Sequence, residues 1–398
     1  MAGKAYANEQ ARSTIEAWIR DGKRAPAAQF PRRGFQEAMA MTPLPAADDT
    51  QSRSLKRFIS QQPAWTPGNE LPWDALFSGF DGPRPRHSGP GVFGGHVFAQ
   101  APLAAARAVE EEDKHSESTG RPMGALGIHS IQGVFTNPGL QDRPFLYEVS
   151  PLLSGRSFKA RLVNARQPKQ PSQSPLGPFP ISDANLPLGD ICFSCITTFK
   201  RPVPTIDEVQ EAHSAQERYA DILSSRAPDE WDLCPQADID LVKELFPNPG
   251  PGAFPILNMH KVDMTAYNAD KAITERRELI FYRLLKPLPK KDVNAHILCH
   301  AFEADRNGLL MLGNYLGYGS GLGPAASLSY SFYVHVNPEE AVMNGEGWWL
   351  QEVCWPRVSA GRCMMESKIW NPEGKHVASG YQDGIIGPEK KSEGESKL

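Results

Sequence analysis

Apolar and polar residues largely alternate along residues 158–165, which predicts a β-strand in a sheet with one wet face. Similar strand patterns occur at 128–135 and 191–199, and again at 327–335 and 376–383. In each half of the chain, a Gly-rich helical segment precedes the first of these strands. One helix followed by long antiparallel strands, twice over, is typical of a duplicated α+β fold.

An internal repeat supports this duplication. Residues 147–158 and residues 351–364 each contain a Glu-Val pair, a nearby proline, a serine and a Gly-Arg pair. The two Glu-Val pairs are 352 − 148 = 204 residues apart. A repeat of this length indicates two copies of one structural unit.

Composition shifts divide the 398 residues into five parts. Pro, Gly and polar clusters mark the loops and linkers between patterned segments. The loop at 168–190 and a helix near 208–223 are predicted on this basis, as is a short helix near residues 9–20. The expected parts are an N-terminal extension (1–64), a first module (65–201), a linker with a helix (202–254), a second module (255–387) and a flexible tail (388–398).

The bulk composition is that of an ordinary globular protein. Hydrophobic residues make up 40% and charged residues 22%, with a formal net charge of −4 and a pI near 6.2. This balance argues against nucleic acid or an anionic membrane as the main partner. The sequence also contains no apolar stretch of membrane-spanning length, and we expect no membrane span.

The six cysteines are scattered, which favours a reducing compartment over a disulfide framework. Cys192 and Cys195 form a C-x-x-C pattern inside the strand predicted at 191–199. Residues three apart on a strand point to opposite faces, so the pair is unsuited to a metal or a redox site. We expect six reduced thiols, no zinc and no cofactor.

The chain ends in Ser396-Lys397-Leu398, which matches the peroxisomal address that a soluble import receptor reads. The preceding residues, 388–395, are rich in charge and are expected to be unfolded. This arrangement predicts a location in the peroxisomal matrix.

The two halves also carry a set of short motifs. In the first half these are Phe93-Gly94-Gly95-His96-Val97-Phe98-Ala99-Gln100-Ala101, His129-Ser130, Asn137-Pro138-Gly139, Arg143-Pro144, Gly155-Arg156-Ser157-Phe158 and Ala165-Arg166-Gln167. In the second half they are Ala304-Asp305, Ala326-Ser327-Leu328, Ser331, His335, Val377-Ala378-Ser379 and Gln382-Asp383-Gly384. Together they resemble the motifs of the acyl-CoA thioesterase II family, over roughly residues 73–200 and 255–387.

The resemblance implies a tandem (double) hot-dog fold, with two curved antiparallel sheets each wrapped around a central helix. It implies hydrolysis of fatty acyl-CoA to free fatty acid and CoA, with the active site in the second module. The family's acid, hydroxyl and amide residues match Asp305, Ser327 and Gln382. Thioester hydrolysis needs an activated water and donors for the oxyanion, and this trio would hold the water. Paired hot-dog sheets often associate further, so a homo-oligomer is possible.

Local sequence suggests that Asp305 caps or begins a helix, where the helix dipole would favour its charge and backbone N–H groups could receive the carbonyl oxygen. Gly94-Gly95 is expected to permit close helix–sheet packing. His129 and His335 are interpreted as core or cross-strand residues, and Arg156 and Arg362 as structural pairing partners more than CoA ligands.

The sequence departs from the family in three places, one of which is the loop at 168–190, which is longer than usual. Family members usually have Leu-Asp-His-Ser-Met-Trp-Phe-His where this chain has residues 328–335, so that Ser329 and Tyr330 replace the acid and the first histidine. In addition, Pro102 should kink the first central helix.

Two other functions compete with hydrolysis. A hot-dog enoyl-CoA hydratase would carry Asp-x-Asn-x-x-His, but here Leu310 follows Asp305 and Asn307 in the place of that histidine. Without this base, proton transfer at two substrate carbons is hard to arrange. A non-catalytic or specialised acyl-CoA-binding protein of a biosynthetic pathway is the third possibility.

Overall fold

A computed structural model describes residues 17, 20–22, 30–45, 55–71, 91–117, 124–246, 249–319, 322–345 and 347–388. The tail with Ser396–Leu398 lies outside the described residues, as does most of the helix expected near residues 9–20.

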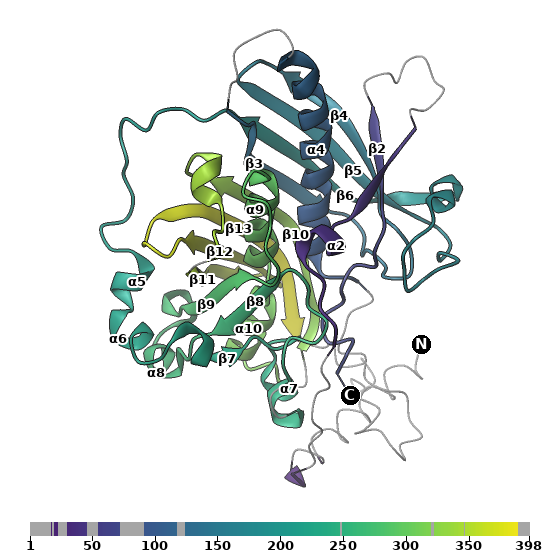
Figure 1. Ribbon diagram of the computed structural model, residues 1–398. Coiled ribbons are helices and arrows are strands. Elements are labelled where there is room, and N and C mark those ends of the chain that lie inside the picture. The colour runs from purple at the N-terminus through teal and green to yellow at the C-terminus, as the bar shows by residue number, and fades with distance from the viewer. Residues whose placement is uncertain are drawn as a thin grey trace.

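Within these residues, thirteen strands form one antiparallel sheet (Figure 1). In sheet order they run β1-β2-β4-β5-β6-β3-β10-β13-β12-β11-β9-β8-β7. The strands are β1 (Met41–Leu44), β2 (Lys56–Ser60), β3 (Gly127–Phe135), β4 (Leu146–Ser154), β5 (Phe158–Pro168), β6 (Leu188–Lys200), β7 (Asp232–Leu233), β8 (Leu257–Lys261), β9 (Glu278–Leu284), β10 (Leu322–Val334), β11 (Trp349–Ser359), β12 (Arg362–Trp370) and β13 (His376–Pro388).

The strand order confirms the duplication. The first half runs β2-β4-β5-β6-β3, and the second half runs β9-β11-β12-β13-β10 when it is read from the opposite edge. The halves meet where β3 pairs with β10, with Ile131 opposite Phe332. The two repeated motifs form equivalent hairpins, β4–β5 and β11–β12. Four of the predicted strands lie within β3, β5, β6 and β13, and the fifth, 327–335, lies within β10 except for its last residue.

The strand equivalence also corrects one predicted boundary. β2 pairs with β4 as β9 pairs with β11, and its Phe58 and Ile59 are buried. Residues 56–60 therefore belong to the sheet of the first module, and the expectation of a peripheral extension ending at residue 64 is wrong for this segment. This strand is only five residues long, too short for a clear alternating pattern in the sequence. Its place in the sheet depends on pairing with β4, which is distant in the sequence.

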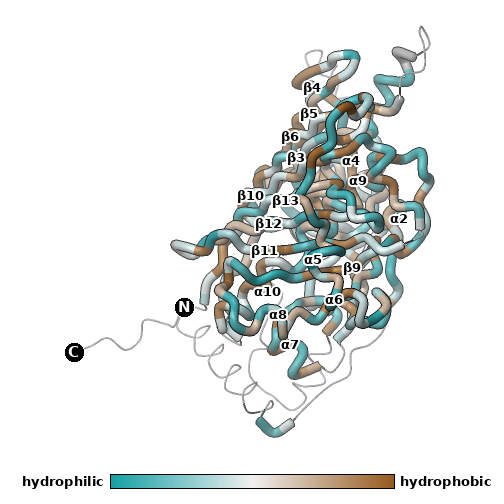
Figure 2. Tube along the Cα trace, turned by 90° about the vertical axis from the view of Figure 1, so that its left-hand side faces the viewer, coloured by the Kyte–Doolittle hydropathy of each residue, from teal (hydrophilic) through white to brown (hydrophobic). Residues whose placement is uncertain are grey.

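Two helices, α4 (Gly94–Glu117) and α9 (Val293–Ala304), cover the concave side of the sheet. Figure 2 shows them on the side of the molecule away from β3–β6 and β10. The helices are α2 (Phe35–Ala38), α4 (Gly94–Glu117), α5 (Ala215–Arg218), α6 (Ala220–Leu223), α7 (Asp240–Leu245), α8 (Thr265–Asn268), α9 (Val293–Ala304) and α10 (Gly308–Tyr315), with 3₁₀ turns at Ile181–Asn185, Pro228–Glu230, Ile273–Glu275 and Pro338–Ala341. Among the described residues, no helix has the length and apolar character needed to cross a bilayer.

Helix α4 is rich in alanine, the strongest helix former, and six of its alanines are fully buried or nearly so. Small side chains let α4 pack closely against α9, which runs beside it. Pro102 lies inside α4, and the helix continues through it to residue 117. In the second module the corresponding stretch is broken into α9 and α10 at residues 305–307.

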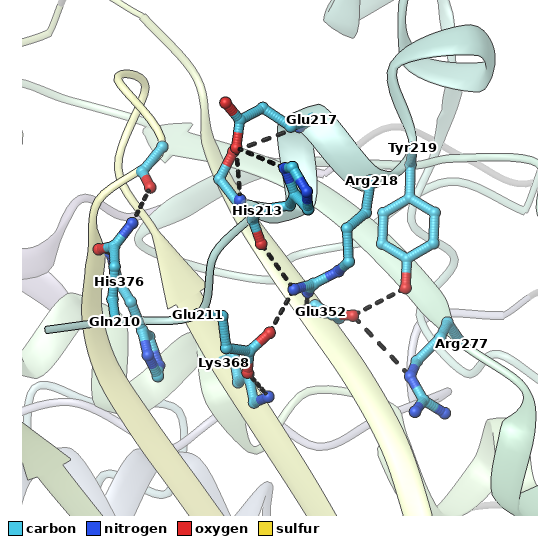
Figure 3. Close-up of polar contacts among 12 residues, drawn as sticks. Gln210, Glu211, His213, Glu217, Arg218, Tyr219, Arg277, Glu352, Lys368 and His376 are labelled. Atoms are coloured by element: carbon cyan, nitrogen blue, oxygen red, sulfur yellow. Dashed lines mark hydrogen bonds and ion pairs between the residues drawn. The ribbon is translucent and has the colours of Figure 1, made fainter.

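The linker between the modules docks on the second half of the sheet (Figure 3). The predicted helix near 208–223 is present as two short helices, α5 and α6. Arg218 and Tyr219 both bind the buried carboxylate of Glu352, the tyrosine hydroxyl at 2.8 Å. Glu352 belongs to the repeated Glu-Val motif, so this copy of the repeat has the additional role of holding the linker.

Candidate active site

Three side chains from separate elements meet at the broken helix of the second module. Asp305 follows α9, Ser327 lies on β10 and Gln382 lies on the neighbouring β13. The Gln382 amide donates to an Asp305 carboxylate oxygen at 2.5 Å and also to the Ser327 hydroxyl. The Ser327 hydroxyl in turn donates to the same Asp305 oxygen at 3.4 Å. Asp305 and Gln382 are buried and Ser327 is half-buried.

Asp305 is not the N-cap that its local sequence suggested. It is the C-cap of α9, with φ −86° and ψ −3°, and Asn307 is the residue that precedes α10. Asn307 has φ 58°, a left-handed conformation that asparagine tolerates better than most residues. At this position the dipole of α9 disfavours the Asp305 charge, because the carbonyl end of a helix is partially negative.

The helix start that faces Asp305 belongs to the other module. The backbone N–H of Gly95, in the first turn of α4, donates a hydrogen bond to the Asp305 carboxylate. A Cβ on Gly94 would lie 3.1 Å from Asp305 Oδ2, so the carboxylate approaches this turn closely. The first N–H groups of a helix lack partners inside it and attract anions. The site therefore lies between the modules, with its side chains from one and its helix start from the other.

Arg306 holds the helix break in place. Its guanidinium donates to the carbonyl of Pro235 at 2.6 Å and to that of Gln236 at 3.0 Å. It also stacks over Trp65 and Phe254, whose ring centroids lie 4.8 Å and 4.2 Å away. These contacts fix the residue after Asp305 and so restrict where the carboxylate can point.

Burial raises the pKa of Asp305 to about 7. The hydrogen bonds from the Gly95 N–H and from the Ser327 and Gln382 side chains oppose this shift, because they favour the charged carboxylate. A carboxyl that titrates near neutral pH can both take and return a proton under physiological conditions.

Family models cover both modules. An acyl-CoA thioesterase N-terminal domain matches residues 83–177, and an acyl-CoA thioesterase C-terminal domain matches residues 261–386, together more than half of the chain. The chain belongs to the acyl-CoA thioesterase family. This is a family of double hot-dog thioester hydrolases, and the observed α+β fold is of that kind.

Individual relatives agree with this assignment. The thioesterase is 24% identical over 315 residues to acyl-coenzyme A thioesterase 8 of Homo sapiens, which covers 74% of this chain and 80% of the human protein. A 78-residue segment is 40% identical to acyl-CoA thioesterase 2 of Haemophilus influenzae, covering 20% of this chain and 23% of that one. The solved structure of an acyl-CoA thioesterase II from Mycobacterium marinum superposes with a TM-score of 0.53 at 18% identity, over 90% of this chain and 99% of that chain, which supports the fold.

Next to the trio lie two polar groups that motif matching did not select for the site. Tyr330, which replaces the family's usual histidine, is buried with its ring 4.4 Å from that of Phe98. Glu303 is fully buried, and burial raises the pKa of its carboxyl well above the ordinary value. Neither the Tyr330 hydroxyl nor the Glu303 carboxyl has a hydrogen-bond partner among the described residues. The sequence signal for Glu303 is a carboxylate in an otherwise apolar stretch, two residues before the matched acid.

The histidines singled out in the sequence lie at the far end of the central strands. His129 is half-buried and packs edge-on against Phe158, as expected of a cross-strand residue. His335 is exposed and shares a hydrogen bond of 2.9 Å with Ser379 on the neighbouring strand β13, so of the two expected positions it has the cross-strand one and not the core one. Both line a cavity of about 430 Å³. Since His335 is eight residues beyond Ser327 along β10, this cavity is roughly 25 Å from the trio.

Arg362 has the structural role expected of it, whereas the pairing expected of Arg156 stays a prediction. Arg362 forms an ion pair with Asp383, as predicted, and Arg156 is exposed at the β4–β5 turn. The Gly94-Gly95 pair allows close packing against both a strand and a helix: a Cβ on Gly94 would lie 3.4 Å from the Phe135 ring of β3, as expected, and a Cβ on Gly95 would lie 2.9 Å from the backbone oxygen of Phe302 in α9. Within the described part of the chain, no group of three or more His, Cys, Asp or Glu side chains is arranged to hold a metal ion.

Proposed function

We propose that this thioesterase hydrolyses fatty acyl-CoA to free fatty acid and CoA by direct attack of a water held by Asp305, Ser327 and Gln382. The observation that carries the proposal is their convergence at the start of α4, on one carboxylate oxygen. The Gln382 carbonyl oxygen is buried and has no hydrogen-bond partner among the described residues, so it can accept a hydrogen bond from that water.

Asp305 takes a proton from the water while the water oxygen bonds to the thioester carbonyl carbon. The carbonyl oxygen becomes an oxyanion, which backbone N–H groups at the start of α4 can receive. The carbon–sulfur bond then breaks, and the proton on Asp305 passes to the departing CoA thiolate. Removing one oxyanion donor typically costs about 2.7–4 kcal/mol of transition-state stabilisation.

We also place this reaction in the peroxisomal matrix, in fatty acid metabolism. The sequence Ser396-Lys397-Leu398 supports this location, since a soluble import receptor reads that tripeptide.

Thiol release from acyl-CoA of varied chain length tests the function. A hydratase or a non-catalytic acyl-CoA-binding protein releases no CoA, so these alternatives predict no signal. Asp305→Asn should lower turnover by about 10²–10⁴, the usual contribution of a positioned acid–base group. Asp383→Asn is the matched control and should leave turnover unchanged. It makes the same substitution at an acid next to Gln382 that forms an ion pair with Arg362 and is not one of the trio.

A single turnover in ¹⁸O-labelled water tests the route. Direct attack places the label in the free acid in the first turnover, whereas an anhydride formed with Asp305 would donate an unlabelled oxygen. If Asp305→Asn keeps near-normal turnover, the assignment is wrong and Glu303 becomes the next candidate base.

A further inference from the structure

A small pocket opens beside the first turn of α4. It has a volume of about 140 Å³ and is formed by segments far apart in the sequence. Its lining includes Trp65, Glu70, His96, Gln141, Leu176 and Ala253. Most of the remaining lining is proline and alanine, and the surface of the wall is about as polar as it is apolar.

His96 is the buried polar group of this pocket. It is 1% exposed, and neither of its ring nitrogens has a hydrogen-bond partner among the described residues. Burial lowers its pKa to about 4, so the ring is neutral at physiological pH. Gln100, one turn further along α4, opposes this shift slightly, but its amide does not reach either nitrogen in hydrogen-bonding geometry. A neutral imidazole has one donor and one acceptor, both unused here, on a side chain that lines the pocket.

The pocket's lining includes none of the trio, but it begins one residue from the contact that holds the Asp305 carboxylate. His96 directly follows Gly95, whose backbone N–H binds Asp305, and consecutive Cα atoms are about 3.8 Å apart. On the other side, Trp65 lines the pocket and stacks on Arg306, the residue after Asp305. When a thioester is held at Asp305, groups a few bonds from its carbonyl can therefore reach this pocket.

We propose that the pocket is a substrate subsite that takes a neutral group able both to donate and to accept hydrogen bonds, with His96 as its specificity-determining residue. This inference rests on the proposed function of the adjoining site. A buried polar group without a partner is costly, and a bound ligand group would remove that cost. Two parts of a substrate have this chemistry: a secondary amide of the CoA pantetheine arm, and a hydroxyl on the acyl chain.

The surrounding charges favour a neutral group over an anion. Burial raises the pKa of Glu70, which shows that this wall disfavours negative charge, and a bound carboxylate would face Glu70 across the pocket. Arg33, which also lines the pocket, is already engaged by Glu37 at 3.3 Å.

The test compares His96→Leu with His96→Gln, which restores a donor and an acceptor. On a thioester that carries the recognised group, His96→Leu should lower kcat/KM by about tenfold, the effect of one or two lost hydrogen bonds. His96→Gln should recover most of that loss. His213→Leu is the matched control, because the His213 side chain lies on the linker and is 74% exposed.

Three substrates identify the source of the group: an unsubstituted acyl-CoA, the same acyl-CoA with a hydroxyl on the chain, and the unsubstituted acyl thioester of a simple alkanethiol. If His96→Leu lowers kcat/KM with both CoA substrates but not with the alkanethiol ester, the recognised group is the pantetheine amide. A loss confined to the hydroxyacyl-CoA identifies the acyl hydroxyl. Equal loss on all three, or no loss on any, overturns the proposal.

Two further measurements keep the result decisive. If His96→Leu does not fold, Leu176→Trp narrows the rim at a side chain that is 85% exposed, and it should raise KM in the same substrate-selective way. If Leu176→Trp changes KM by the same factor on all three substrates, the subsite is again overturned. Binding of a non-hydrolysable acyl-CoA thioether to His96→Leu, measured by calorimetry, reports on the pocket without turnover. It therefore separates failure of the subsite from failure of the proposed chemistry.

Discussion

The backbone N–H of Gly95 donates a hydrogen bond to the Asp305 carboxylate, and this contact joins the start of α4 to the helix break of the other module. The two residues are 305 − 95 = 210 positions apart in the sequence. Each module thus supplies part of one site: the second provides the acid, the hydroxyl and the amide, and the first provides the helix start. Neither module carries the complete arrangement alone.

The proposed role of Asp305 as the base predicts a pH dependence of catalysis, because burial raises the pKa of this carboxyl to about 7. The base acts in its ionised form, so kcat/KM should rise with pH through about 7 and then level off. Steady-state rates between pH 5 and 9 measure this limb. A limb centred near pH 4 would show that Asp305 is not buried as described.

The same shift predicts a stability effect. Because the folded-state pKa lies above the unfolded value of 3.8, folding favours the protonated form. The contribution of Asp305 to the free energy of unfolding is present below pH 3.8 and is lost as pH rises through about 7. The loss amounts to at most about 4 kcal/mol. Asp305→Asn should therefore be more stable than wild type at pH 8, with a smaller difference at pH 5, as measured by urea unfolding.

The trio should behave as one unit. Ser327→Ala and Gln382→Ala should each lower turnover with smaller effects on KM, since they contact the water and not the acyl chain. Because Gln382 bonds both partners, the double variant should lose less than the product of the single losses. Independent, multiplicative losses would argue against a shared water.

The two glycines of α4 should respond differently to alanine. Gly95→Ala places a Cβ 2.9 Å from the Phe302 backbone oxygen, which cannot move freely, so both the thermal midpoint and activity should fall. Gly94→Ala places a Cβ 3.1 Å from Asp305 Oδ2, a side-chain atom, so turnover should fall with little loss of stability. Calorimetry and thiol release on both variants check this contrast.

Localisation is tested by deleting Ser396–Leu398. A fluorescent fusion of the truncated chain should stay diffuse in the cytosol, while thiol release in vitro remains unchanged. Continued entry into peroxisomes would mean that the tripeptide is not the signal, or that the protein enters with a partner.

The sequence alone determined the duplication and the main strands. The duplication follows from the Glu-Val and Gly-Arg repeat and from the motif order. The strands follow from the alternating patterns, because the periodicity of a strand depends only on a few neighbouring residues. The same motif order selected Asp305, Ser327 and Gln382, and the structure brings these three together.

Only the tertiary structure decided the environment of these residues. The local sequence of Asp305 suggested an N-cap, but the residue ends α9 and faces the start of α4. β2 and the His96 pocket were missed for the same reason, since each exists only through pairing or packing with distant segments. Burial and charge at such points depend on how two modules meet, and no local pattern in either module records that contact.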